Sequence, residues 1–343
     1  MKKLLNTLYV TIPETYLSLD GENVVILKEH QELGRAPLHN LERIMTFGYM
    51  GVSPALMGKC VADKIELVFM NPYGKFLARL EGSISGNVLL RREQFRIAED
   101  PEKTLEIAKN MIIGKLYNSR QLVLRVLRDH EMRVDQELFR KKAEFMKVAM
   151  LKCKDVEDMN RLRGFEGESA SVYFSIFNDM ILQQKKDFIF STRSKRPPLD
   201  KVNALLSFCY SLCTSMCTSA LESVGLDPYV GFMHTDRPGR RSLALDLLEE
   251  FRAWHCDRFV LMLINKKVVS ADDFQEREDG AVYLNEKGRK TVLAMWQKKK
   301  MEVVKHPFLG EKVEWGMLPY IQALLLARYI RGDLDTYPVF LWK

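Results

Sequence analysis

One segment that could carry out chemistry covers residues 163–170, where Glu166 stands between Gly164 and Gly167. Two glycines at the entrance of a helix cost about 1 kcal/mol each relative to alanine. Close approach of another backbone or of a ligand to Glu166 is one reason for accepting that cost. The plainer interpretation is a helix start that places acids near its positive end. This segment alone leaves both interpretations open.

A second candidate is the loop over residues 231–241, which is marked by proline and glycine and contains His234. A lone histidine in a loop is usually only solvated or hydrogen-bonded. Here three arginines follow it closely, namely Arg237, Arg240 and Arg241. The planar fork of arginine suits bidentate contact with phosphate. The loop therefore indicates a role in handling phosphate, in which His234 takes part.

A third candidate is the helix predicted directly after that loop. Its apolar stripe consists of Leu243, Leu247, Leu248 and Phe251. Asp246 and Glu249, three residues apart, share a neighbouring face. Two carboxylates on one face repel unless a cation, a proton or an arginine lies between them, so a divalent metal is one explanation. Pairing of Arg252 with either acid on a solvated flank is the other.

Together, Glu166, His234 and Glu249 form the pattern of an open catalytic metal site. Carboxylate oxygens suit Mg²⁺ and Mn²⁺, and an imidazole ligand makes Mn²⁺ more acceptable. The open positions of such a site take a phosphate oxygen and a water or hydroxyl, whose pKa the metal lowers. Nearby arginines then position a phosphodiester.

The elements that position these residues follow from a change in periodicity along the chain. Up to about residue 85 the pattern has period two, which predicts strands over residues 8–11, 16–19, 24–27, 65–70 and 75–80. Asp20-Gly21 suits a tight hairpin, and Ser53 before Pro54 predicts the start of a short helix. Residues 1–85 are therefore predicted to form a small β-rich domain resembling a sandwich.

Beyond Asp100-Pro101 the spacing changes to three and four, which predicts helices. We expect them over residues 101–117, 120–130, 134–150, 165–186, 201–223, 241–252, 258–266, 287–302 and 313–331. Residues 86–100 are predicted to be a linker, and residues 101–343 a larger all-helical domain. The fold class is thus α+β, with the candidate site in the helical domain.

Charge locates a second property in the helical domain. The chain of 343 residues carries a net charge of +7, and residues 1–99 are nearly neutral. Two basic runs, over residues 185–201 and 286–300, carry a net +4 and +5. Charge runs are most often solvated faces, but two of them beside a candidate phosphate site favour nucleic acid as the partner.

Cysteine usage and hydropathy bear on the compartment. The six cysteines are too few and scattered for a disulfide framework, which indicates a reducing compartment. Cys209, Cys213 and Cys217 share one helical stripe and are interpreted as small core residues rather than metal ligands. No window approaches 18 uninterrupted apolar residues, so we expect no membrane span and a cytoplasmic protein.

At this point the chain resembles a known family along essentially its whole length. The motifs are YLSLDG (16–21), FGYMGVSPALM (47–57), GFEG (164–167), DKVNALL (200–206), GFMH (231–234) and DLLEEFR (246–252). Together they resemble the CRISPR-associated integrase/endonuclease of the spacer-acquisition module. The form from type I systems of subtype C is the most similar.

The resemblance implies a β-rich N-terminal domain that forms a homodimer and a helical domain that holds one divalent metal. It places the metal ligands at Glu166, His234 and Glu249, with Asp246 as a further acidic residue of the site. It also places Arg237 and Arg252 facing DNA; we expect Arg240 and Arg241 to join them.

The resemblance further implies that two dimers bracket a dimer of a small second subunit. A short DNA duplex would be inserted into the repeat array by attack of its 3′-hydroxyl on a phosphodiester, and water in place of the hydroxyl would give nuclease action, also on branched DNA. The competing hypotheses are a non-catalytic DNA-binding scaffold of the same complex and a metal hydrolase for small phosphate compounds.

Overall fold

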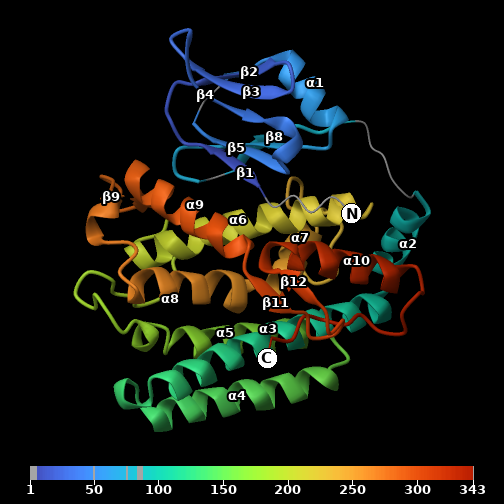
Figure 1. Cartoon of the computed structure of the whole chain (residues 1–343). Coiled ribbons are helices and arrows are strands. Elements are labelled where there is room, and N and C mark those ends of the chain that lie inside the picture. Colours follow the sequence, from blue (N-terminus) through green and yellow to red (C-terminus); the bar gives the residue numbers. More distant parts are fainter. Residues whose placement is uncertain (1–5, 49–50, 75, 83–87, 343) are drawn as a thin grey trace.

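Two four-stranded sheets lie face to face at the N-terminal end of the computed structural model, which describes residues 6–48, 51–74, 76–82 and 88–342 (Figure 1). The strands of this domain and its helix are β1 (Thr7–Val10), β2 (Tyr16–Asp20), β3 (Asn23–Lys28), β4 (Gln31–Pro37), β5 (Arg43–Phe47), β6 (Gly51–Val52), α1 (Pro54–Ala62), β7 (Glu66–Met70) and β8 (Phe76–Arg79). The larger part contains α2 (Val88–Glu99), α3 (Pro101–Asp129), α4 (Gln136–Lys154), α5 (Met159–Phe174), α6 (Lys201–Ser223), α7 (Ser242–Glu249), α8 (Arg258–Asn265), β9 (Phe274–Glu276), β10 (Val282–Leu284), α9 (Glu286–Lys300), β11 (Val303–Lys305), β12 (Lys312–Glu314) and α10 (Leu318–Ile330).

The β domain has the predicted sandwich-like architecture. One sheet has the order β1-β5-β7-β8, with β1, β5 and β7 parallel; the other has the order β4-β3-β2-β6. Leu17 and Val24 from one sheet pack with Ile44 and Leu67 from the other in a shared apolar core. Helix α1 starts as predicted, because the Ser53 hydroxyl accepts a hydrogen bond from the Leu56 amide at 3.2 Å.

Three strands of this domain were missing from the sequence prediction, namely β4, β5 and β6. All five residues of β5 are buried, so its sequence does not alternate between apolar and polar. The expected strand over residues 75–80 is β8, whereas Lys75 lies outside the described residues.

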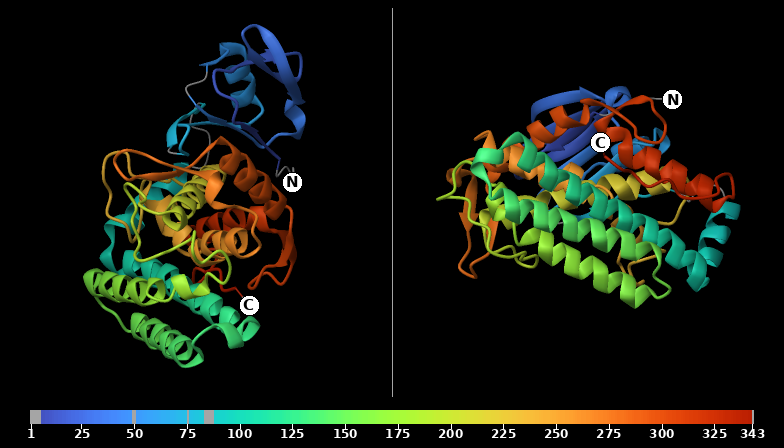
Figure 2. Two further views of the ribbon diagram at one scale, coloured as in Figure 1. Left: turned by 90° about the vertical axis from the view of Figure 1, so that its left-hand side faces the viewer. Right: turned by 90° about the horizontal axis from the view of Figure 1, so that it is seen from below.

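The same burial explains how the domains dock. Ile44 of β5 faces the sandwich core, whereas Met45 and Phe47 join the core of the helical domain. The ring of Phe47 lies 6.1 Å from that of Phe208 on α6. Because strand side chains alternate between faces, β5 is buried on both sides. Figure 2 shows the β domain seated on one end of the helical part.

Helix α3 is one element of 29 residues where the sequence predicted two helices. It begins as predicted at Asp100, whose side chain accepts the amides of Glu102 and Lys103. The polar residue Asn118 near the expected break is buried and donates to the carbonyl oxygens of Glu250 and Phe340, both at 2.8 Å. A buried polar side chain with partners needs no helix end.

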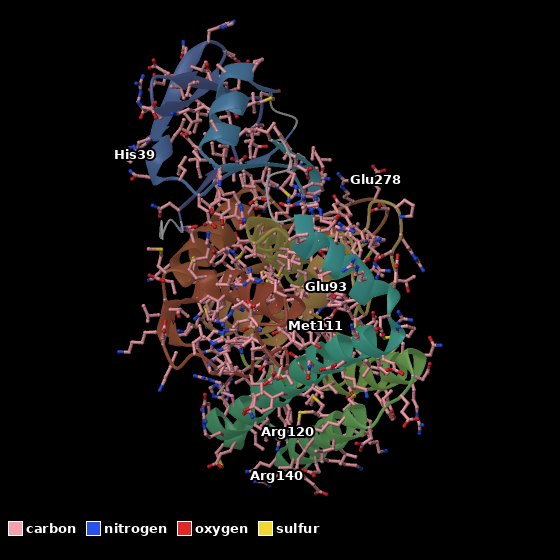
Figure 3. The ribbon with its side chains drawn as sticks, turned by 90° about the vertical axis from the view of Figure 1, so that its right-hand side faces the viewer. His39, Glu93, Met111, Arg120, Arg140 and Glu278 are labelled. Carbon is pink, nitrogen blue, oxygen red and sulfur yellow. The ribbon has the colours of Figure 1, made fainter. Side chains whose placement is uncertain are left out.

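The predicted linker over residues 86–100 is mostly helix α2, with residues 86 and 87 outside the described part. In Figure 3, Glu93 marks α2, Met111 and Arg120 mark α3, and Arg140 marks α4 along the side of the helical domain. The all-helical prediction also needs correction, because this domain contains two short antiparallel ribbons, β9–β10 and β11–β12.

Helix α6 lies in the layer of the helical domain that is next to the β domain (Figure 1). It is long and apolar enough to cross a membrane, but 78% of its most apolar window is buried inside the protein. Cys209, Cys213 and Cys217 lie in this core and are fully buried, which confirms that they are core residues.

Candidate active site

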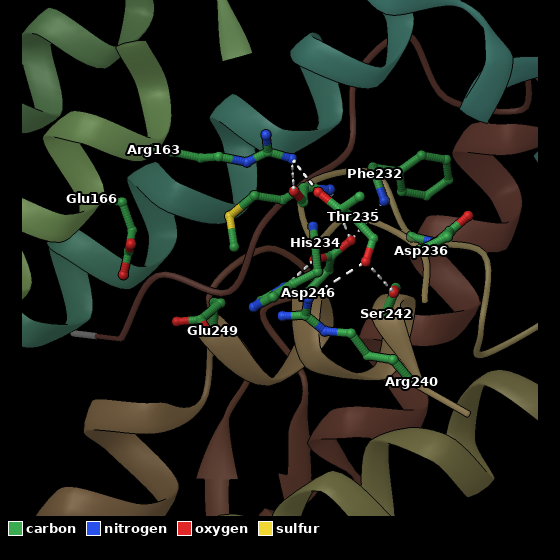
Figure 4. Close-up of polar contacts among 12 residues, drawn as sticks. Arg163, Glu166, Phe232, His234, Thr235, Asp236, Arg240, Ser242, Asp246 and Glu249 are labelled. Carbon is green, nitrogen blue, oxygen red and sulfur yellow. Dashed lines mark hydrogen bonds and ion pairs between the residues drawn. The ribbon is translucent and has the colours of Figure 1, made fainter. Parts of the chain in front are cut away.

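Glu166, His234 and Glu249 are far apart in sequence but are brought close together on three elements (Figure 4). Glu166 lies in the interior of α5, His234 in the loop before α7, and Glu249 at the end of α7. The placement of residues 163–170 at a helix entrance was wrong, because α5 begins at Met159 with Asp158 as its cap, whereas the approach of a ligand to Glu166 stays a prediction. A Cβ at Gly164 or Gly167 would meet no described atom within 4 Å, so close backbone approach does not explain these glycines.

Asp246 lies behind His234 and is paired with it, so it is not an unpaired acid beside Glu249. It is fully buried, and its Oδ1 lies 2.6 Å from Nδ1 of the His234 ring. Its two oxygens also accept the backbone N–H groups of Phe232, Met233 and His234. A carboxylate on one ring nitrogen fixes the orientation of a histidine and leaves Nε2 for a metal. Asp246 is therefore a positioning residue.

The loop can close against α7 because residue 231 is glycine. A Cβ at Gly231 would lie 2.6 Å from the Ser242 Cβ and 2.9 Å from the Asp246 carboxylate. Any larger residue would push the loop and His234 away from Asp246. The sequence marked this loop correctly but did not indicate which glycine it needs.

Lys115 of α3 connects the two candidate glutamates, and sequence reasoning missed it. Its ammonium bonds to Glu166 Oε1 and lies 2.7 Å from Glu249 Oε2. On the other side of Glu249, Arg252 Nη2 lies 3.0 Å from Oε1, the pairing that was one alternative for this helix. The detectable signal was a single lysine within an apolar stretch of α3, residues 111–117.

These cations keep Glu249 ionised although the residue is 3% exposed. Burial alone raises the pKa of a carboxyl group. Against that effect, the charges of Arg252 and Lys115 lower the pKa of Glu249 to about 2. Glu249 is therefore a charged oxygen donor at neutral pH.

The donor set fits a divalent cation such as Mg²⁺ or Mn²⁺. Two carboxylates and an imidazole are present, and Glu249 Oε2 is buried without a hydrogen bond from the described residues. As these side chains lie, no group of three His, Cys, Asp or Glu residues within the described chain is arranged to hold a metal. Lys115 lies between the two glutamates instead.

A pocket of about 460 Å³ opens beside Glu166 and is rich in cations. Its charged lining consists of Lys115, Glu166, Arg193, Lys195, Arg252 and Asp257. Arg193 and Arg252 both lie over the Tyr210 ring, at 5.3 and 4.9 Å. Partial burial and these two arginines lower the pKa of Lys195. Crowded like charges of this kind suit an anion.

Asp257 on the wall of this pocket was also absent from the sequence analysis. It lies in a π-helical turn after α7 and accepts the hydroxyls of Tyr210 at 2.7 Å and Tyr173 at 2.9 Å. Burial raises its pKa to about 6. Its place depends on the turn geometry, which the sequence pattern does not reveal.

The loop arginines differ in their surroundings. Arg237 is exposed, whereas Arg240 donates to the Thr235 carbonyl at 3.4 Å. Arg241 lies 3.9 Å from the Phe76 ring of the β domain, so it serves a domain contact. Arg252 is directed at Glu249 and the pocket.

The two basic runs also differ. Arg193 and Lys195 of the first run line the pocket. In the second run, Lys300 is 2% exposed and donates to Thr7 of the β domain at 3.0 Å. Arg289 is buried and donates to the Leu284 carbonyl. Neither alternative for a basic run, a solvated face or a nucleic-acid contact, therefore fits these buried members of the second run.

A sequence model of the family described as CRISPR associated protein Cas1 matches residues 8–298. This chain belongs to the Cas1 family. A protein of Chlorobaculum tepidum named CRISPR-associated endonuclease Cas1 1 is 46% identical over 343 residues, covering all of both chains. A protein of Rhodospirillum rubrum named CRISPR-associated endonuclease Cas1 2 is 50% identical over 358 residues, again covering both chains fully.

Solved structures show the same Cas1 fold. A CAS1 protein from Thermotoga maritima superimposes with a TM-score of 0.81 at 21% identity, over 97% of this chain and 99% of that one. A casposase bound to integration product gives 0.82 at 24% identity, over 96% and 92%. A Cas6-RT-Cas1--Cas2 complex gives 0.82 at 20% identity, over 98% of this chain and 36% of that one.

Proposed function

We propose that this Cas1 protein is a metal-dependent DNA endonuclease and integrase that inserts short DNA duplexes into a CRISPR array. The observation that carries the proposal is the meeting of Glu166, His234 and Glu249 beside a pocket lined by cations. The relatives are named as endonucleases, which supports the proposal. The fold shared with a casposase bound to integration product is in keeping with it.

In the proposed mechanism, Glu166, His234 and Glu249 hold one Mg²⁺ or Mn²⁺. A bound cation lowers the pKa of a hydroxyl or water and neutralises charge on the phosphate. Asp246 keeps Nε2 of His234 directed away from itself by bonding Nδ1. Arg252 keeps Glu249 ionised. Attack of a DNA 3′-hydroxyl on an array phosphodiester forms a new P–O bond and breaks the old one, releasing a 3′-hydroxyl of the array, which is integration. Attack of water breaks the same kind of bond and leaves a phosphate end and a hydroxyl end, which is cleavage of duplex or branched DNA.

The chain's cations position the DNA in this proposal. Arg193, Lys195 and Arg252 are placed to bind phosphate oxygens at the pocket, where like charges are crowded. The exposed Arg237 and the half-buried Arg240 bind the DNA backbone farther out. The stacking of Arg241 on Phe76 makes it the weakest of the predicted DNA contacts.

The assembly part of the proposal rests on the resemblance and on a neighbouring fold. Residues 1–85 form the homodimer contact, and residues 101–343 form the catalytic domain. Two dimers bracket a dimer of the small second subunit; a Cas6-RT-Cas1--Cas2 complex contains the same fold. We further propose a cytoplasmic location and membership of type I, subtype C.

A non-catalytic DNA-binding scaffold is the second candidate function, and one observation favours it. Both glutamates already have cationic partners, Lys115 and Arg252, without any metal. Satisfied ion pairs of this kind also occur in sites with a purely structural role. The two candidates differ in their response to metal.

The test uses the full-length chain with branched DNA and Mn²⁺. We expect His234→Ala to lower strand transfer and cleavage about 100-fold or more, with chelator doing the same to the wild type. DNA binding should persist in both cases because the cations remain. His39→Ala, on the exposed surface of the β domain, is the matched control. Undiminished strand transfer by His234→Ala contradicts the site, and salt-sensitive binding without any metal-dependent reaction supports the scaffold.

A further inference from the structure

Lys115 is a charged residue in a place where lysine is rarely found. Its side chain is 11% exposed, and the side chains of Glu249 and Glu166 are 3% and 24% exposed. The three residues come from α3, α7 and α5. A lysine is almost never buried in this way unless it is paired. Its ammonium therefore requires the two glutamates as much as they require a cation.

The reason for a cation at this point is electrostatic. Two carboxylates held close together in a poorly solvated site repel each other and cost free energy unless a positive charge lies between them. Lys115 supplies one positive charge at that position, where a divalent cation would supply two. The lysine ammonium is a compact point charge on a flexible stem, so it can leave without rearranging the helix.

We propose that Lys115 takes the place of the divalent cation in the metal-free protein. It holds Glu166 and Glu249 together and moves aside when the metal binds. The inference rests on the proposed function, because it takes these glutamates as metal ligands. Lys115 is then a positioning residue that competes with the metal and sets its affinity.

The surroundings give the displaced ammonium a place to go. Lys115 itself lines the pocket of about 460 Å³. Ser169 lines the same pocket, and its hydroxyl is buried without a hydrogen bond from the described residues. The contact of Lys115 with Glu249 is a buried ion pair at 2.7 Å, so it breaks at low cost only when a metal at Oε2 replaces the charge of the lysine.

Arg252 is the second cation at Glu249 and differs from Lys115 in being held by its surroundings. Its guanidinium pairs with Glu249 Oε1 at 3.0 Å and lies over the Tyr210 ring. Arg252 contacts Oε1 of Glu249, whereas Lys115 contacts Oε2. Arg252 can therefore remain on Oε1 while Oε2 exchanges Lys115 for a metal.

The first test is titration of Mn²⁺ alone into full-length protein by calorimetry, without DNA. Lys115→Met keeps the length of the side chain and removes its charge; we expect it to bind Mn²⁺ at least about 10-fold more tightly than the wild type. Lys109→Met changes a half-buried lysine of the same helix whose ammonium donates to the Lys154 carbonyl; it is the control and should bind as the wild type does. Binding by Lys115→Met that is equal or weaker overturns the proposal.

The second test needs no variant and so does not depend on folding. An amine-reactive label is applied to wild-type protein with and without Mn²⁺, and the labelling rate of each lysine is read by mass spectrometry. We expect Mn²⁺ to raise the rate at Lys115 severalfold and to leave Lys109 unchanged. A rate at Lys115 that does not rise overturns the proposal.

The outcomes separate this proposal from the function on which it rests. If Mn²⁺ binds the wild type and Lys115→Met equally well, the metal site stands and the role of Lys115 is wrong. If Mn²⁺ binds neither protein, the proposed metal site fails, and the proposal for Lys115 fails with it.

Discussion

Glu249 and Glu250 are neighbours in the chain and are both buried, yet their surroundings are opposite in kind. Glu249 faces two cations, Lys115 and Arg252, and its pKa falls to about 2. Glu250 faces neutral donors, and burial raises its pKa to about 7. The donors are the Tyr337 hydroxyl, the Gln322 amide and the Phe340 backbone N–H.

The difference separates a carboxylate that we propose to be functional from one that holds the fold. Glu250 makes a closed network that ties α7 to α10 and to the C-terminal residues, since Gln322 and Tyr337 also bond each other. Glu249 is ion-paired with Lys115 at Oε2 and with Arg252 at Oε1, and both cations line the pocket. An acid whose partners are cations can exchange one of them for a metal ion, whereas one with all its partners neutral holds the fold.

The largest expected effect compares conservative changes at the two acids. Glu249→Gln should lower metal-dependent cleavage of branched DNA about 100-fold or more, because it removes a charged ligand next to Lys115 and Arg252. Glu250→Gln mimics the protonated acid and should stay within a few fold of the wild type. Cleavage rates at saturating Mn²⁺ measure both. If both variants lose cleavage activity equally, Glu249 and Glu250 do not differ in role.

The next effect is on how the free energy of unfolding depends on pH. The pKa of Glu250 is raised in the folded protein, so the native state keeps a proton that the unfolded chain releases. This contribution is fully present below about pH 4.5, the usual value, and is lost as the pH rises to about 7. We expect the wild type to lose about 2 kcal/mol relative to Glu250→Gln between pH 5 and 7.5. Urea unfolding at both pH values measures this, and a constant difference contradicts it.

A third variant tests whether the Glu250 network holds the fold. Tyr337→Phe removes a hydroxyl that bonds both Glu250 and Gln322, which should lower the free energy of unfolding by about 1–2 kcal/mol. Tyr16→Phe, at an exposed position, is the control and should change it by less than about 0.5 kcal/mol. Urea unfolding measures both; if Tyr337→Phe is as stable as the control, the network does not hold the fold.

The smallest expected effect is on DNA affinity and compares a lysine at the pocket with one in the second basic run. Lys195 lines the pocket, whereas Lys290 of the second basic run pairs with Glu286 at 2.7 Å. Lys195→Ala should reduce the slope of log affinity for duplex DNA against log salt by about 1, which corresponds to one phosphate contact. Lys290→Ala should leave the slope unchanged. If the salt dependence of affinity is the same in both variants, the two basic runs do not differ in DNA contact.

Local chemistry made part of this structure predictable. Ser53-Pro54 and Asp100-Pro101 mark the starts of α1 and α3 because a cap and a proline act within a few residues. The period of two before residue 85 and the spacing of three and four beyond residue 100 predicted a β domain followed by a helical domain. Strand β5 escaped because both its faces are buried, so it has no alternation to detect.

The residues proposed for the site could be selected from the sequence, whereas their contacts could not. Glu166, His234 and Glu249 meet as expected, while the role of Asp246 behind His234 depends on how the loop folds back. Lys115 escaped because it lies 51 residues before Glu166 in the chain, and only packing of α3 on α5 and α7 brings them together. Long-range pairing of this kind leaves no periodic trace in a sequence.

The most direct test of the central claim is a crystal structure of the protein soaked in Mn²⁺, with anomalous scattering recorded to locate the metal. We expect one anomalous peak about 2.0–2.3 Å from a Glu166 oxygen, a Glu249 oxygen and Nε2 of His234. Lys115 should have withdrawn from both glutamates in that crystal, while Glu250 keeps its neutral partners. A peak elsewhere, or none at a Mn²⁺ concentration that supports DNA cleavage, contradicts the account.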